Sequence, residues 1–188
     1  MSNKIYPIGI QNFESLRKDG YFYIDKTALI YQLVKTGRYY FLSRPRRFGK
    51  SLLLSTLEAY FQGKKELFEG LAMEKLEKDW IKYPILHLDL NIGKYDAPDS
   101  LDKILNEALL GWEALYGSRE GESTLALRFK GVVDRACKLT GQRVVILVDE
   151  YDKPLLQAIG NEALQTEYRN TLKPFYGVLK TMDGCIRF

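Results

Sequence analysis

Cysteine, histidine and long apolar runs are scarce in this chain of 188 residues. Its two cysteines, Cys137 and Cys185, and its one histidine, His87, predict neither a disulfide framework nor a cysteine–histidine metal site. The sequence has no run of about 18 apolar residues and no apolar signal core at its N-terminus. We therefore expect no membrane span and a cytoplasmic location.

What the chain does contain is the composition of an ordinary globular protein. Hydrophobic residues make up 46% and charged residues 28%, which is enough for one sizeable core. The net charge of +4 is modest, and part of the positive charge is concentrated in Arg44, Arg46 and Arg47. Such a cluster suits phosphates, either those of a nucleotide or those of nucleic acid.

One short string carries the strongest motif, LSRPRRFGKSLLL at residues 42–54. Gly49, Lys50 and Ser51 fit the phosphate-binding pattern G-x-x-x-x-G-K-[ST], but Arg44 stands where the first glycine belongs. The aromatic run Tyr39–Leu42 predicts a buried strand before the loop, and the leucines after it predict a helix. Strand, loop and helix are the context that the motif requires.

The loop chemistry follows from its position at a helix N-terminus, which offers backbone N–H groups and the positive end of the helix dipole. Gly49 lets the backbone approach phosphate oxygens because it has no Cβ. Lys50 can place its ammonium on the β and γ oxygens, and the Ser51 hydroxyl can bind Mg²⁺. The predicted nucleotide-binding residues are Arg44, Pro45, Arg46, Arg47, Phe48, Gly49, Lys50, Ser51 and Leu52.

Arg44 changes the expected path of the loop. A non-glycine residue with positive φ costs about 1–2 kcal/mol, and Pro45 favours extended geometry at Arg44. We therefore predict that the loop enters extended and turns later, near Phe48 and Gly49. Arg46 and Arg47 then either contact phosphate oxygens or pair with surface carboxylates or a partner domain.

A second motif lies about a hundred residues further along. The run Val144–Val148 is β-branched and aliphatic, as in a strand of a parallel sheet that is covered on both faces. Asp149 and Glu150 follow at its C-terminal end, where ligands bind in open α/β folds. Asp149 can hold the Mg²⁺ shell and Glu150 can polarise the attacking water. The alternative is that the pair only ends a strand and caps a helix.

The remaining polar candidates have simpler interpretations. Asp25 and Asp152 are predicted as helix N-caps, and Asp152 has metal binding as its alternative. His87 lies in the strand predicted over Ile85–Leu90 and is interpreted as a structural residue. Asp89, near the end of that strand, is a weaker candidate for supporting the site.

The order of predicted elements is β-α-β-α-α-β-α-β, which indicates right-handed crossovers and a three-layer α/β fold with a parallel sheet. Helices are expected near residues 101–115, 123–140 and 161–182, with a kink or a break at Pro174. We expect a single domain over residues 1–188, in which 1–38 form a lead-in and a helix and 39–188 form the nucleotide-binding core.

Three strings together resemble one known family: YIDKT at 23–27, SRPRRFGKS at 43–51 and VDEYDKP at 148–154. They are similar to the AAA-ATPase-like domain of bacterial proteins, a P-loop ATPase of the additional-catalytic-glutamate class. In that family an arginine at the first-glycine position is normal. The resemblance runs from about residue 5 to the last residue. It implies ATP binding, with Lys50 and Ser51 on nucleotide and metal and with Asp149 and Glu150 as the acidic pair.

The resemblance carries further expectations. Relatives usually have a C-terminal domain that resembles restriction-type nucleases. In the wider class, the strand predicted to begin at Cys185–Phe188 bears a polar sensor residue and is followed by a lid. We therefore expect a C-terminally truncated core, in which ATP binding is more secure than hydrolysis. A role of residues 25–27 near the base or ribose, and an oligomer with an arginine supplied between subunits, are left open.

The sequence thus predicts an ATP-binding, Mg²⁺-dependent ATP-hydrolysing module. Lys50 and Glu150 are its catalytic residues, and Ser51 and Asp149 are its metal ligands. Two alternatives remain at this point. One is a module whose basic loop binds nucleic-acid phosphates, and the other is a P-loop scaffold with weak or no hydrolysis.

Overall fold

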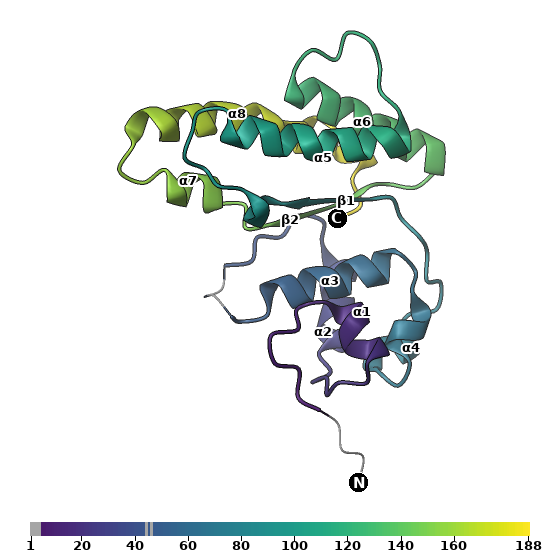
Figure 1. Cartoon of the computed structure of the whole chain (residues 1–188). Helices are drawn as coiled ribbons and strands as arrows, with labels where there is room; N and C mark the ends of the chain where they lie inside the picture. The colour runs from purple at the N-terminus through teal and green to yellow at the C-terminus, as the bar shows by residue number, and fades with distance from the viewer. Residues whose placement is uncertain (1–4, 44, 46) are drawn as a thin grey trace. The chain divides into compact units, whose positions relative to one another are not determined.

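The computed structural model describes residues 5–43, 45 and 47–188. They form two compact units (Figure 1). The N-terminal unit comprises the residues up to Ile85 together with Phe188, and the C-terminal unit comprises Leu86–Arg187. The expectation that the whole chain acts as one domain stays a prediction.

The N-terminal unit is helical. It contains α1 (Phe13–Lys18), α2 (Thr27–Thr36), α3 (Lys50–Phe61), the 3-10 turn η1 (Lys65–Phe68) and α4 (Ala72–Leu76). Its core is aromatic, because the ring of Phe68 lies 5.0 Å from that of Phe13 and 5.1 Å from that of Trp80, measured between centroids. Phe13 and Phe68 are completely buried. The helix predicted after the basic loop is therefore confirmed as α3, and it packs into this unit.

The N-cap position of α2 is occupied by Lys26 and not by Asp25, so the predicted cap is wrong by one residue, but the Asp25 side chain still contacts the start of the helix. Its Oδ1 accepts hydrogen bonds from the backbone N–H of Thr27 (2.8 Å) and from the hydroxyl of Thr27 (2.6 Å). Its Oδ2 accepts another from the backbone N–H of Ala72 (2.7 Å). Asp25 therefore ties the beginning of α2 to the beginning of α4.

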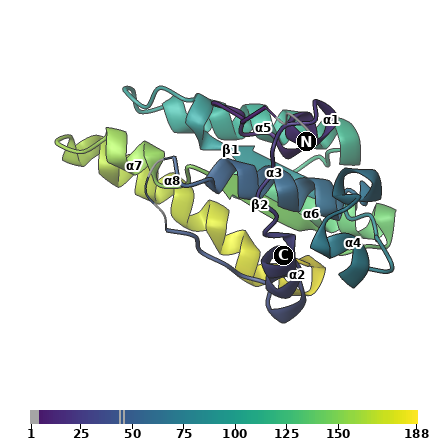
Figure 2. The same cartoon turned by 90° about the horizontal axis from the view of Figure 1, so that it is seen from below.

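The C-terminal unit has an α/β architecture. Strands β1 (Ile85–Asp89) and β2 (Val145–Asp149) form a small parallel sheet. Between them lie the turn η2 (Leu90–Ile92) and the helices α5 (Ser100–Tyr116) and α6 (Leu125–Thr140). After β2 come α7 (Lys153–Gln157), α8 (Glu162–Thr181) and the turn η3 (Asp183–Cys185). Helices α5, α6 and α8 cover one face of the sheet (Figures 1 and 2).

The core of this unit follows the sequence periodicities. Leu86 and Leu88 share one face of β1, Leu90 follows the strand at the start of η2, and each of the three is at most 2% exposed. They pack in one cluster with residues of α5, α6 and α8, including Phe129 and Phe175, whose rings stack with centroids 4.4 Å apart. Apolar residues recurring every second position on the strand and every third or fourth on the helices therefore place this core correctly.

The structure differs from the sequence prediction at three elements. The strand expected at Tyr39–Leu42 is wrong, because no strand is assigned there and Phe41 is 68% exposed. Aromatic composition favours a strand only where neighbouring strands bury it, and local sequence does not specify those neighbours. Pro174 lies inside a continuous α8, so of the two expected outcomes the break is wrong and the kink stays a prediction. The strand expected near Cys185–Phe188 is present as a single parallel bridge between Ile186 and Val144.

The α/β class is thus confirmed, whereas the three-layer P-loop architecture stays a prediction, because the described sheet has two strands. Cys137 and Cys185 are free thiols, and both are half-buried. Within the described part of the chain, no helix has the length and apolar character that a membrane crossing needs.

Candidate functional site

The basic loop turns where the sequence predicted it would. Arg47 has φ 68° and Gly49 has φ 75°, both in the left-handed region, and α3 begins at the next residue, Lys50. A left-handed arginine costs about 1–2 kcal/mol, which the surrounding structure must offset. Arg44 and Arg46 lie outside the described residues, so the predictions for them are not tested.

The first turn of α3 carries the residues predicted to hold phosphate and metal. Lys50 and Ser51 are half-buried, whereas Phe48 is 64% exposed. The N-cap residue, Gly49, makes no side-chain hydrogen bond to this turn. A twelve-residue helix with a glycine at its N-cap presents its N-terminal backbone and dipole without an acidic or hydroxyl side chain at that position.

The acidic motif lies at the end of β2, as predicted. Asp149 is the last residue of the strand, and its Oδ1 accepts a hydrogen bond from the backbone N–H of Glu150 (2.9 Å). Glu150 has φ 52°, so it too is a non-glycine residue in the left-handed region. Both side chains are half-buried. The acidic pair therefore does not simply continue into a helix; it occupies a sharp, strained turn.

A second carboxylate lies at the same edge of the sheet. β1 ends at Asp89 and β2 at Asp149, and the carboxyl ends of parallel strands share one edge. Asp89 is exposed, and its Oδ1 accepts from the backbone N–H of Asn91 (2.7 Å). Asp89 therefore shapes the turn after β1, and its supporting role at the site stays a prediction.

Asp152 occupies the N-cap position of α7, as predicted, but its side chain makes no capping hydrogen bond. Pro154 lies in the first turn of the helix. The side chain that secures α7 is instead Lys153, whose ammonium donates to the backbone carbonyl and to Oδ1 of Asn91. The contact between Lys153 and Asn91 was not predicted from the sequence. The one sequence feature that points to it is that both residues follow predicted strands, and parallel strands end at the same edge of a sheet.

The two motifs belong to different units. Lys50 and Ser51 lie in the N-terminal unit, and Asp149 and Glu150 lie in the C-terminal unit. Their convergence on one nucleotide therefore stays a prediction. The donor set itself fits Mg²⁺, which usually takes one or two protein oxygens and completes its shell with phosphates and water. A separate cluster of three or more histidine, cysteine, aspartate or glutamate side chains suited to a metal does not occur among the described residues.

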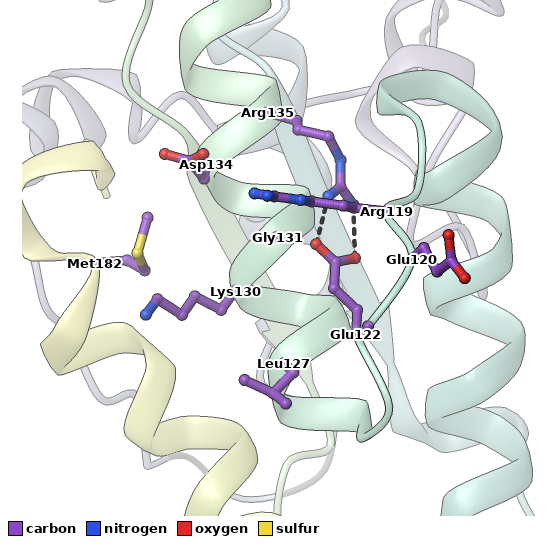
Figure 3. A pocket seen from close by; sticks show the side chains of 10 residues that line it. Arg119, Glu120, Glu122, Leu127, Lys130, Gly131, Asp134, Arg135 and Met182 are labelled. Carbon is purple, nitrogen blue, oxygen red and sulfur yellow. Dashed lines mark hydrogen bonds and ion pairs between the residues drawn. The ribbon is translucent and has the colours of Figure 1, made fainter.

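A hollow of about 520 Å³ lies elsewhere in the C-terminal unit, at α6 and the loop before it (Figure 3). Its lining includes three basic side chains, Arg119, Lys130 and Arg135, and three acidic ones, Glu120, Glu122 and Asp134. Arg135 pairs with Glu122 across 2.6 Å. Because the charges balance and no residue of either motif lines the hollow, we do not assign a phosphate ligand to it.

Taken together, the C-terminal unit shows an α/β fold with an acidic edge where its two strands end. The N-terminal unit adds a basic loop that turns at a glycine into a helix. These are features of nucleotide-binding α/β proteins.

Comparison with known proteins identifies the family within that class. The family described as "Predicted AAA-ATPase" matches residues 7–188, and the chain belongs to it. The chain is also similar to a protein of Azotobacter chroococcum mcd 1 described as "Uncharacterized protein in vnfD 5'region". The two are 42% identical over 190 residues, which cover 100% of this chain and 37% of that protein. No solved structure matches. The resemblance seen in the sequence is thus confirmed, and the family supports ATP as the ligand.

Proposed function

We propose that this chain binds ATP together with Mg²⁺ and that it hydrolyses the terminal phosphate bond. The observation that carries the proposal is the left-handed backbone conformation at the two motifs. Of the described non-glycine residues, Arg47, Trp80 and Glu150 have positive φ, and two of these three lie in the motif turns. Strained backbone of this kind is concentrated at functional sites.

Each side chain has a defined role in this proposal. The Lys50 ammonium neutralises charge on the β and γ phosphates, and the N–H groups at the start of α3 bind phosphate oxygens. The Ser51 hydroxyl and the Asp149 carboxylate would hold Mg²⁺, which supplies charge neutralisation as the bond to the leaving group breaks. Glu150 orients a water molecule in line with that bond and accepts its proton.

The fold proposed for this function is a P-loop core in which the α3 loop and the end of β2 face one nucleotide. The three-layer architecture and the additional-catalytic-glutamate class are part of the proposal. We also propose that longer relatives carry a further domain, because this chain spans 37% of the relative described above.

Calorimetry with ATP, ADP and GTP, each with and without Mg²⁺, tests binding. Lys50→Ala should abolish ATP binding, because it removes the charge that faces the phosphates. Lys138→Ala is the matched control, since that lysine is 73% exposed and pairs only locally with Asp134 in α6. Equal ATP affinity of Lys50→Ala and the parent chain would remove the phosphate role of the loop.

Hydrolysis is tested separately from binding. Glu150→Gln retains the size of the side chain but not its basicity, so it should keep ATP affinity and lose turnover by about 10²–10⁴-fold. Phosphate release measured at saturating ATP and Mg²⁺ reports this loss. If the variant releases phosphate as fast as the parent chain, Glu150 is not the base.

A further inference from the structure

The turn between β2 and α7 is held from outside by one lysine. Glu150 is left-handed, with φ 52°, and its carbonyl accepts a hydrogen bond from the backbone N–H of Lys153 (3.0 Å). Asp149 Oδ1 accepts from the Glu150 N–H at the other side of the same residue (2.9 Å). A backbone conformation of this kind persists only where its surroundings fix it. Here one of the groups that fix it is the backbone N–H of Lys153, the first residue of α7.

Lys153 is itself anchored to the turn that follows β1. Its ammonium donates to the backbone carbonyl of Asn91 and, over 3.0 Å, to Asn91 Oδ1. Asn91 is fixed in turn, because its N–H donates to Asp89 Oδ1 over 2.7 Å. The result is a continuous path of hydrogen bonds from the end of β1 to the acidic turn after β2.

A second contact runs beside the first. The backbone N–H of the buried Tyr95 donates to Oε1 of Gln157 at the end of α7 (3.0 Å). Both ends of this short helix are thus tied to the segment after β1. Five residues are too few for a helix to be stable by itself, so α7 depends on these contacts and on its packing.

We propose that Lys153 is a positioning residue for Glu150, and that it acts through Asn91 to hold the carboxylate in the direction that water activation requires. The inference rests on the proposed function for its catalytic meaning. An ammonium suits this role because it has three donors and can satisfy two oxygens of Asn91 at once. Lys153 does not itself contact phosphate in this account, so its loss affects turnover rather than binding.

The kinetic test compares Lys153→Met with the parent chain. Methionine keeps most of the apolar stem and removes the donors. We expect kcat to fall by about tenfold or more, because misplacing a catalytic group is costly, while ATP affinity stays within about twofold. Lys153→Arg, which restores donors, should recover most of the loss. A parallel rise in KM and Kd, or an unchanged kcat, would overturn the proposal.

A double-mutant cycle tests the route through Asn91. Asn91→Ala removes Oδ1 but leaves the carbonyl that Lys153 also contacts, so it should lower kcat less than Lys153→Met does. The double variant should be no slower than Lys153→Met alone. Lys94→Met serves as the matched control, since that lysine pairs with Asp96 on the same segment and is 85% exposed. Fully additive losses would exclude the route.

Amide hydrogen exchange on the nucleotide-free chain separates this inference from the proposed function. Lys153→Met should speed exchange at positions 150 and 153, where the N–H groups bond to Asp149 Oδ1 and Glu150 O, and Lys94→Met should not. If the parent chain neither binds nor hydrolyses ATP, the proposed function fails, while the exchange result still decides whether Lys153 holds the turn. Unchanged exchange in Lys153→Met would refute the inference outright.

Discussion

Tyr60 donates its phenolic hydrogen to the buried carboxylate of Glu77 across 2.5 Å. The Glu77 side chain is 4% exposed and also pairs with the ammonium of Lys35 at 2.9 Å. Backbone N–H groups of Lys78 and Asp79 donate to its other oxygen. One carboxylate thus joins α2, α3 and the segment after α4 in the N-terminal unit, the unit that presents the basic loop.

The contacts of Glu77 predict that the stability of the protein depends on pH. Burial acts to raise the pKa of Glu77, but hydrogen bonds from Tyr60 and Lys35 and from the backbone outweigh it and lower the pKa from 4.5 to about 2. A lowered folded-state pKa stabilises the protein above the unfolded-state pKa. That stability, up to about 3 kcal/mol, is lost as the pH falls from about 4.5 towards 2.

Denaturant unfolding at several pH values checks it. Glu77→Gln should lower the free energy of unfolding at pH 7 and weaken its dependence on pH below about 5. Glu107→Gln, at an exposed position of α5, should change neither. A Glu77→Gln variant with the same acid sensitivity as the parent chain would show that this carboxylate does not carry the effect.

Two tyrosines in α8 should respond oppositely to loss of the hydroxyl. The Tyr176 hydroxyl is buried without a hydrogen-bond partner in the described part of the chain, and burial raises its pKa to about 12. The Tyr168 hydroxyl donates to the carbonyl of Ala97 over 2.7 Å. Tyr176→Phe should raise the free energy of unfolding by about 1 kcal/mol, and Tyr168→Phe should lower it by about as much. Thermal unfolding of the two variants compares them directly, and equal shifts would be the wrong outcome.

Two helical glycines provide a similar contrast, one of them, Gly131, at the charged hollow and the other, Gly177, in α8. A Cβ on Gly131 would lie 1.9 Å from Glu122 Oε1, whereas a Cβ on Gly177 would meet nothing within 4 Å. Gly177→Ala should therefore stabilise the chain by up to about 1 kcal/mol through helix propensity. Gly131→Ala must displace Glu122 from Arg135, which opposes that gain, and should be less stable than Gly177→Ala by about 1–2 kcal/mol. Stabilisation by both to the same extent would mean that the ion pair shifts without cost.

The sequence predicted those elements whose signal is local. β1, β2, α5 and α6 follow from alternation or helical periodicity together with caps and glycine stops, and the late turn of the loop follows from Pro45 and Gly49. The strand at Tyr39–Leu42 was predicted from composition alone and is not formed.

The contacts that organise the candidate site could not be predicted in the same way. Asn91 and Lys153 are 62 positions apart, and Tyr60 and Glu77 are 17 apart. Each pair joins a charged residue to a polar one, with no periodicity to mark it, and each forms only because separate elements pack together. The left-handed backbone at Glu150 is likewise a property of the folded turn, since glutamate has no local preference for that conformation.

The central claim is that Ser51 and Asp149 serve one metal–nucleotide complex. Replacing Mg²⁺ with paramagnetic Mn²⁺ in the presence of ATP and recording amide NMR spectra tests it most directly, because broadening falls off steeply with distance from the ion. The account predicts strong broadening at the start of α3 and at the end of β2 in the same titration, and its loss in Lys50→Ala. Broadening at the start of α3 alone, with the amides around Asp149 and Glu150 unaffected, would contradict it.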